Sequence, residues 1–172
     1  MADLPALPPV NTSGKKLAVG WFSFTCSEDS TILFTELLND HLEEWKKFVD
    51  FKYLKALKMN NQIEGLDVAF VEGAISSEKQ AAELKRIREN AKVLVAIGSC
   101  ACTGQPSATR NNLFDNEINY KVYWYFSHFD YSHEVKKLED LVKVDEKVMG
   151  CPMNADSFIG TLARSLKTFN II

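Results

Sequence analysis

Apolar side chains gather in three nearly unbroken runs, Leu17–Phe22, Leu66–Val71 and Val93–Ile97. Continuous apolar character is typical of strands that are buried on both faces of a parallel sheet. A fourth segment, Phe51–Leu57, alternates with lysines, and such charges are typical of an edge strand because they guard against mispairing. The pattern therefore predicts three central strands and one strand at an edge.

The segments between these runs repeat their apolar residues with the period of a helix. Asp29–Lys47 places its large apolar residues close to the spacing of one buried face. Ser77–Asn90 opens with a serine that has Gln80 three places on, which is a capping-box pattern. A last helix is expected over Asn154–Thr168. The alternation of strands and helices predicts an α/β fold of flavodoxin-like type, an open parallel sheet with helices on both faces.

Composition and charge narrow the class of protein. The first residues are rich in proline and then polar, which predicts a flexible N-terminal arm over 1–15 and a single domain over 16–172. A formal net charge of -3 leaves no basic field to hold nucleic acid. No run approaches eighteen apolar residues and the start lacks a signal-peptide pattern, so we expect no membrane insertion and a cytoplasmic location.

Three of the four cysteines follow predicted strands. Cys26 comes after the first run, Cys100 follows the third, and Cys151 follows a short apolar segment at 148–150. Because loops at the carboxyl ends of parallel strands form the crevice of such a sheet, we expect these thiols to converge. A glycine close before Cys100 and another before Cys151 let the backbone approach a bound group, and a Cys-Pro step often ends a run of cluster ligands. The pattern favours an iron–sulfur cluster.

Other chemistry for these thiols stays open at this point. A free cysteine is often only a small buried hydrophobe. Structural zinc usually takes closely spaced Cys-x-x-Cys pairs, which the chain lacks. A nucleophilic cysteine needs a base, and His41, His128 and His133 have no recognisable relation to a cysteine. No glycine-rich phosphate-binding motif is present, so the sequence does not support nucleotide binding.

Aromatic residues crowd the segment from Tyr120 to Tyr131, where seven of twelve side chains are aromatic. A small domain cannot easily bury so many rings, and aromatic enrichment is typical of protein interfaces. The segment therefore predicts an interface, with packing beneath a long loop as the alternative.

Three groups of residues together carry a family resemblance: Thr25–Asp29, then Val71–Ile75 with Ile97–Ala101, and Gly150–Pro152. They resemble the small subunit of [NiFe] hydrogenase, in the family shared with the 20-kDa subunit of NADH:quinone oxidoreductase, over about residues 17–165. The resemblance implies an electron-transfer subunit without catalytic residues of its own. It would hold the proximal [4Fe-4S] cluster that exchanges electrons with a Ni-Fe centre in a large subunit. The chain is similar to the short, single-cluster subunits of cytoplasmic hydrogenases, which pass electrons to a diaphorase or similar subunit.

The resemblance implies that Cys26, Cys100 and Cys151 are cluster ligands. It also implies that Glu72 lies near the subunit interface and organises hydrogen bonds there, with a carboxylate that only caps a strand end as the alternative. The family has a further cysteine three residues before the one that matches Cys26, where this chain has Ser23. One ligand of the family's set is therefore missing.

Cys102 is the favoured fourth ligand, because it follows Cys100 by two residues and thiolate suits clusters better than oxygen does. The alternatives for the fourth position are Asp29, Ser23, or a [3Fe-4S] cluster with three ligands. In each of these alternatives, Cys102 is a plain core residue.

Two other functions fit the same family. A labile or absent cluster would make the chain a redox sensor or a scaffold in a hydrogenase-like complex. A quinone-coupled respiratory homologue is the other, although the tandem cysteine pair of that branch is absent around Cys26.

Overall fold

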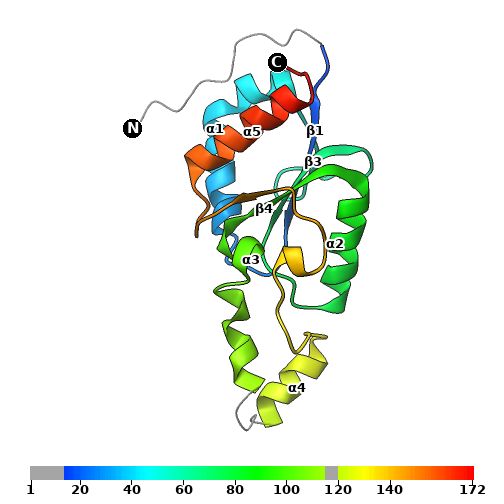
Figure 1. Ribbon diagram of the computed structural model, residues 1–172, viewed down its shortest axis with the longest axis vertical. Helices are drawn as coiled ribbons and strands as arrows, with labels where there is room; N and C mark the ends of the chain where they lie inside the picture. Colours follow the sequence, from blue (N-terminus) through cyan, green and yellow to red (C-terminus); the bar gives the residue numbers. More distant parts are fainter. Residues whose placement is uncertain (1–13, 115–119) are drawn as a thin grey trace.

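Five parallel strands form one sheet in the order β2-β1-β3-β4-β5 (Figure 1). The computed structural model describes residues 14–114 and 120–172, so that residues 1–13 of the predicted N-terminal arm lie outside the described residues. This strand order is the flavodoxin-like one. The predicted α/β fold with an open parallel sheet is confirmed. The strands are β1 (Leu17–Ser23), β2 (Val49–Leu54), β3 (Leu66–Glu72), β4 (Ala91–Ile97) and β5 (Glu146–Val148).

Helices cover both faces of the sheet (Figure 1). The three predicted helices are present, with bounds within one residue of the expected ones, as α1, α2 and α5. Helices α1 and α5 pack on one face, and α2 packs on the other. The helices are α1 (Asp29–Phe48), α2 (Glu78–Asn90), α3 (Gly98–Thr103), α4 (Tyr120–His128) and α5 (Ala155–Thr168), with short 3-10 helices η1 (Ser107–Phe114) and η2 (Leu138–Asp140).

The two faces explain why the central strands are apolar throughout. On β1, Val19 and Trp21 enter the layer beneath α1 and α5, whereas Phe22 enters the layer beneath α2. Trp21 stacks on Phe34 of α1 with ring centroids 4.2 Å apart, and Phe158 of α5 meets the same indole edge-on. Such ring pairs stabilise a core beyond their buried area. The strand ends are thereby held in fixed positions for the loops that follow them.

Three elements depart from the sequence expectation. The predicted edge strand at Phe51–Leu57 is β2 and does lie at an edge, but it begins and ends earlier. The opposite edge is β5, three residues long, which is too short to show a pattern of its own. The residues after β4, expected to form a loop, form the short helix α3.

Asp67 supplies a testable electrostatic contribution to this fold. Its carboxylate is 4 % exposed, accepts the Ala18 N–H at 3.0 Å and forms an ion pair with Lys92 at 2.7 Å. Burial raises the pKa of Asp67, but these two partners outweigh burial and hold that pKa below its usual value. A carboxylate with a lowered pKa stabilises the fold above its usual pKa, and this contribution is lost as the pH falls through the folded-state pKa.

Asp67→Asn should therefore lower the free energy of unfolding at neutral pH by about 1–2 kcal/mol and flatten its loss in acid. Urea denaturation at several pH values measures both effects. Asp50→Asn is the control, because Asp50 forms an exposed ion pair with Lys52. An unchanged acid dependence in Asp67→Asn would contradict the assignment.

Candidate functional site

The carboxyl ends of β1, β3 and β4 open into loops that surround one small pocket. Three cysteines far apart in the sequence line this pocket, together with two carboxylates. The lining residues are Cys26, Ser27, Asp29, Ser30, Glu72, Ile97, Gly98, Ser99, Cys100 and Cys151. Cys26, Cys100 and Cys151 therefore lie at one pocket, as expected from their positions after the strands.

Backbone contacts hold the loops together. Thr25 and Ala74 exchange two hydrogen bonds, at 3.0 and 2.9 Å, which joins the Cys26 loop to the end of β3. Gly73 permits this approach, because it has φ of 91° and an added Cβ would lie 2.8 Å from the Phe24 backbone. The Ser99 N–H donates to the Gly150 carbonyl at 2.7 Å, which joins the other two cysteine loops. These backbone hydrogen bonds fix the loops that carry the three thiols.

Cys26 and Cys100 have polar partners at their sulfur atoms. The backbone N–H of Glu28 donates to Cys26 Sγ at 3.3 Å, and Cys100 Sγ lies 3.2 Å from the Ser107 hydroxyl. Burial, followed by the charge of Glu72, raises the pKa of the Cys26 thiol to about 12. Without a positive group, the thiol form of Cys26 is favoured. A bound cation or cluster would reverse this preference, because it stabilises thiolate.

Cys151 contacts Asp29, the acidic residue at the start of helix α1. Its Sγ donates to Asp29 Oδ2 at 3.1 Å, although the two residues are separated by 122 positions. This hydrogen bond raises the pKa of Cys151, and the charge of Asp29 adds to the effect. Asp29 is therefore placed at the cysteine pocket by the start of α1. Ser23 is not among the residues that line this pocket: its hydroxyl donates to Glu28 at 3.1 Å and lies 3.7 Å from Cys26 Sγ.

Cys102 does not join the other cysteines. It was expected at the same edge because it follows Cys100 by two residues, but both residues lie on helix α3. Two residues of an α-helix turn through about 200°, so the two side chains point in opposite directions. Cys102 is 4 % exposed in the core beneath α2, with its Sγ 3.5 Å from the Ala96 carbonyl oxygen. The structure brings together three of the four predicted cysteines and places Cys102 elsewhere.

Glu72 holds the start of α1 from the neighbouring strand. Its carboxylate is 2 % exposed and accepts the N–H groups of Ser30 at 3.1 Å and Thr31 at 3.0 Å, and also the Thr31 hydroxyl. Burial raises the pKa of Glu72, and these hydrogen bonds oppose that shift. The first turn of a helix has N–H groups without partners inside the helix, and Glu72 satisfies two of them. Glu72 thereby positions Asp29 beside Cys151.

Glu72→Ala should lower the free energy of unfolding by about 3 kcal/mol, because it leaves two buried N–H groups without an acceptor. Glu72→Gln, which keeps an acceptor oxygen, should lose less than half of that. Urea denaturation measures the difference, with Glu89→Ala on the exposed face of α2 as the control. Equal losses in the alanine and glutamine variants would contradict this role.

The thiols and carboxylates of the pocket are not arranged as the ligands of a single metal ion. Within residues 14–114 and 120–172, no three or more His, Cys, Asp and Glu side chains are arranged to hold a single metal ion.

In the same described segments, every helix is too short or too polar to cross a bilayer.

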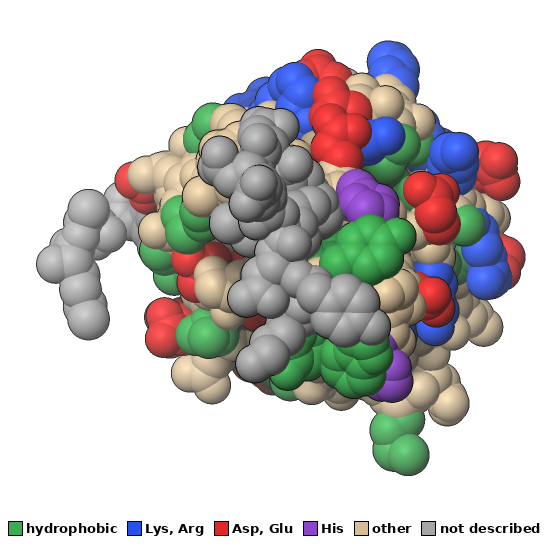
Figure 2. All heavy atoms as spheres, turned by 90° about the horizontal axis from the view of Figure 1, so that it is seen from below, with side chains coloured by type: hydrophobic (Ala, Val, Ile, Leu, Met, Phe, Trp, Pro, Cys, Tyr) green, Lys and Arg blue, Asp and Glu red, His purple; other side chains and the backbone are tan. Residues whose placement is uncertain are grey.

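The aromatic segment lies at the end of the molecule that carries α4 (Figure 1). Figure 2 views the molecule from this end and shows hydrophobic side chains gathered beside histidines. The side chain of Tyr120 lies outside the described residues. The rings that are largely exposed are Tyr123, Trp124, Tyr125, Phe129 and Tyr131. Because these rings are not packed beneath a loop, the interface remains the prediction for this segment.

Comparison with known proteins identifies the family. The family described as NADH ubiquinone oxidoreductase, 20 Kd subunit, matches residues 26–165. The chain belongs to this family. The resemblance inferred from the cysteine segments is confirmed.

Relatives in this family include named hydrogenase subunits. A subunit of the F420-non-reducing hydrogenase vhu of Methanocaldococcus jannaschii is 30 % identical over 141 residues, which cover 73 % of this chain and 49 % of that protein. The NAD-reducing hydrogenase HoxS subunit delta of Cupriavidus necator is 28 % identical over 110 residues, 55 % of this chain and 53 % of that protein. The chain thus spans about half the length of these curated relatives.

A solved structure shares the fold over nearly its whole length. A chain of an NAD+-reducing [NiFe]-hydrogenase in the H2-reduced state superposes with a TM-score of 0.76 at 20 % identity. The match covers 90 % of this chain and 93 % of that one. The likeness supports the flavodoxin-like sheet as the fold of this family member.

Proposed function

We propose that the chain is the electron-transfer small subunit of a cytoplasmic [NiFe]-hydrogenase-like complex and holds one [4Fe-4S] cluster. Its partner would be a large subunit with a Ni-Fe centre, and a further subunit of diaphorase type would accept the electrons. The observation that carries the proposal is the convergence of Cys26, Cys100 and Cys151 on one pocket of a chain from this family. Four unpaired cysteines are consistent with a reducing compartment.

The ligand set that the contacts support best is Cys26, Cys100, Cys151 and Asp29. All four line the pocket, and Asp29 contacts Cys151. Three thiols that lose their protons on binding, together with a carboxylate, would give four anionic donors, and thiolates are the usual ligands of iron–sulfur clusters. Because a cluster presents several irons rather than one, its ligands need not surround a single point. We therefore assign the fourth position to Asp29 in place of Cys102.

A cluster in this pocket would supply a one-electron carrier. The chain's own residues would set its environment: the Glu28 N–H is directed at Cys26 Sγ, and the Ser107 hydroxyl lies beside Cys100 Sγ. Hydrogen bonds to ligating sulfur and burial of the site tune the reduction potential of such centres. Nothing in this role requires the chain to bind hydrogen itself.

The test is iron and acid-labile sulfide per chain, with EPR, on the complex purified without oxygen. The proposal expects about four irons per chain and a signal in the reduced state. Absence of iron from the intact complex would overturn it and favour a scaffold. A cluster that is lost during repeated oxidation and reduction would favour a redox sensor, whereas a stable one supports electron transfer.

A further inference from the structure

A second and larger pocket lies at the carboxyl ends of β1 and β2 and contains no cysteine. Its volume is about 340 Å³, within the range of small-molecule sites but too small for a dinucleotide. In open α/β sheets, ligands bind outside the carboxyl ends of strands. The lining residues are Trp21, Phe22, Ser23, Phe24, Glu28, Thr31, Tyr53, Lys55, Ala56 and Glu83.

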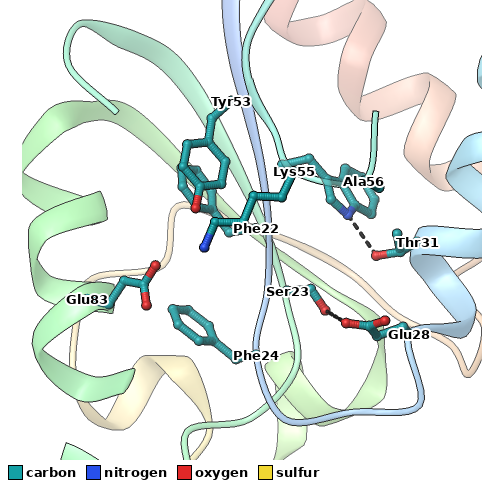
Figure 3. A pocket seen from close by; sticks show the side chains of 10 residues that line it. Phe22, Ser23, Phe24, Glu28, Thr31, Tyr53, Lys55, Ala56 and Glu83 are labelled. Atoms are coloured by element: carbon teal, nitrogen blue, oxygen red, sulfur yellow. Dashed lines mark hydrogen bonds between the residues drawn. The ribbon is translucent and has the colours of Figure 1, made fainter. Parts of the chain in front are cut away.

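The floor of this pocket is aromatic and rigid. Phe22 and Tyr53 are buried and stack with ring centroids 4.2 Å apart and planes inclined by 24°. Phe24 lies on the other side of the opening, as Figure 3 shows. Flat apolar surfaces of this kind favour a planar ligand, because offset-stacked and edge-to-face ring contacts stabilise it. An aliphatic ligand would gain no such preference.

The rim carries opposite charges. Figure 3 shows the ammonium of Lys55 and the carboxylate of Glu83 directed toward one another over the aromatic floor. Lys55 also lies 5.6 Å from the centre of the Tyr53 ring. Glu83 accepts no hydrogen bond from the part of the chain that the structure describes. The rim therefore offers a strong donor and a strong acceptor side by side.

We propose that this pocket binds a planar heteroaromatic compound whose edge carries a carbonyl group next to a ring N–H. The carbonyl accepts from Lys55, the ring N–H donates to Glu83, and the ring lies against the aromatic floor. Isoalloxazine rings and uracil bases share this chemistry and differ in ring size. The site goes beyond the proposed function, and its residues do not include the proposed cluster ligands. Iron content and ligand binding are separate measurements.

The test is isothermal titration of the whole chain with riboflavin and with uridine. Binding of riboflavin but not uridine would identify an isoalloxazine ring as the ligand, and binding of uridine but not riboflavin would identify a uracil base. The 3-methyl derivative of each compound lacks the ring N–H and should bind at least about tenfold more weakly, because charge-assisted hydrogen bonds are strong. If neither compound binds, or if the methylated derivatives bind equally well, the proposal is wrong.

Matched variants locate the site. Lys55→Met and Glu83→Met should each weaken binding about tenfold or more. Lys52→Met on β2, three residues before Lys55, and Glu89→Met on α2, the helix that also carries Glu83, remove the same charges outside the pocket and should leave binding unchanged. Ala56→Trp fills the exposed rim without altering a charge, and it should also block binding. Equal effects in the pocket variants and their controls would overturn the proposal.

Discussion

Replacing Cys100 by alanine should remove the bound iron from the subunit altogether. Cys100 lines the proposed site from a helix that is packed against β3, β4 and β5, so that no neighbouring thiol can take its place. Cluster binding is coupled to folding, and the loops that carry Cys26 and Cys151 should therefore loosen as well. Iron and sulfide analysis of the complex measures the loss, and limited proteolysis of these loops measures the loosening.

Cys102→Ala is the matched control, two residues away on the same short helix. It should retain all of the iron, because its thiol contacts the Ala96 and Val148 carbonyl oxygens in the core. Its cost is a lower free energy of unfolding, by about 1 kcal/mol, from the lost sulfur volume. Iron that persists in Cys100→Ala but disappears in Cys102→Ala would contradict the assignment of these two residues.

The fold could be predicted from hydrophobic periodicity because its central strands are buried on both faces. The runs at Leu17–Phe22 and Val93–Ile97 are apolar because alternate residues enter two different layers. The capping serine at 77 is found as the N-cap of α2, where its hydroxyl accepts the Gln80 N–H. Hydrophobic periodicity predicted the long elements. It failed for β5 and α3, which are too short for a pattern of apolar residues to repeat.

The cysteine pocket was predictable in part, for a related reason. Strand ends decide where Cys26, Cys100 and Cys151 lie, and strand ends can be read from the sequence. The direction of Cys102 depends on whether residues 98–103 form a loop or a helix, and six residues show no clear period. The contact between Asp29 and Cys151 joins residues 122 positions apart, and no local pattern reports it. The Glu72 hydrogen bonds that hold the start of α1 also join residues far apart in the sequence.

Removing the Asp29 carboxylate should convert the cluster from a four-iron to a three-iron form. In Asp29→Ala the three cysteines keep three ligand positions, while the fourth iron loses its protein ligand and dissociates. The expected result is about three irons per chain and an EPR signal in the oxidised rather than the reduced state. Asp29→Cys should restore four irons, because it returns a thiolate to the same position of α1.

Two control variants separate ligation from the role of Asp29 at the start of the helix. Asp29→Asn keeps the size and an acceptor oxygen for the Ser30 N–H, so it should preserve helix α1 and still lose the fourth iron. Ser23→Ala should keep four irons, because Ser23 is not among the residues that line the cysteine pocket. Four irons in Asp29→Asn together with three in Ser23→Ala would transfer the fourth ligand to Ser23. Four irons in both variants would mean that neither the Asp29 carboxylate nor the Ser23 hydroxyl is a cluster ligand.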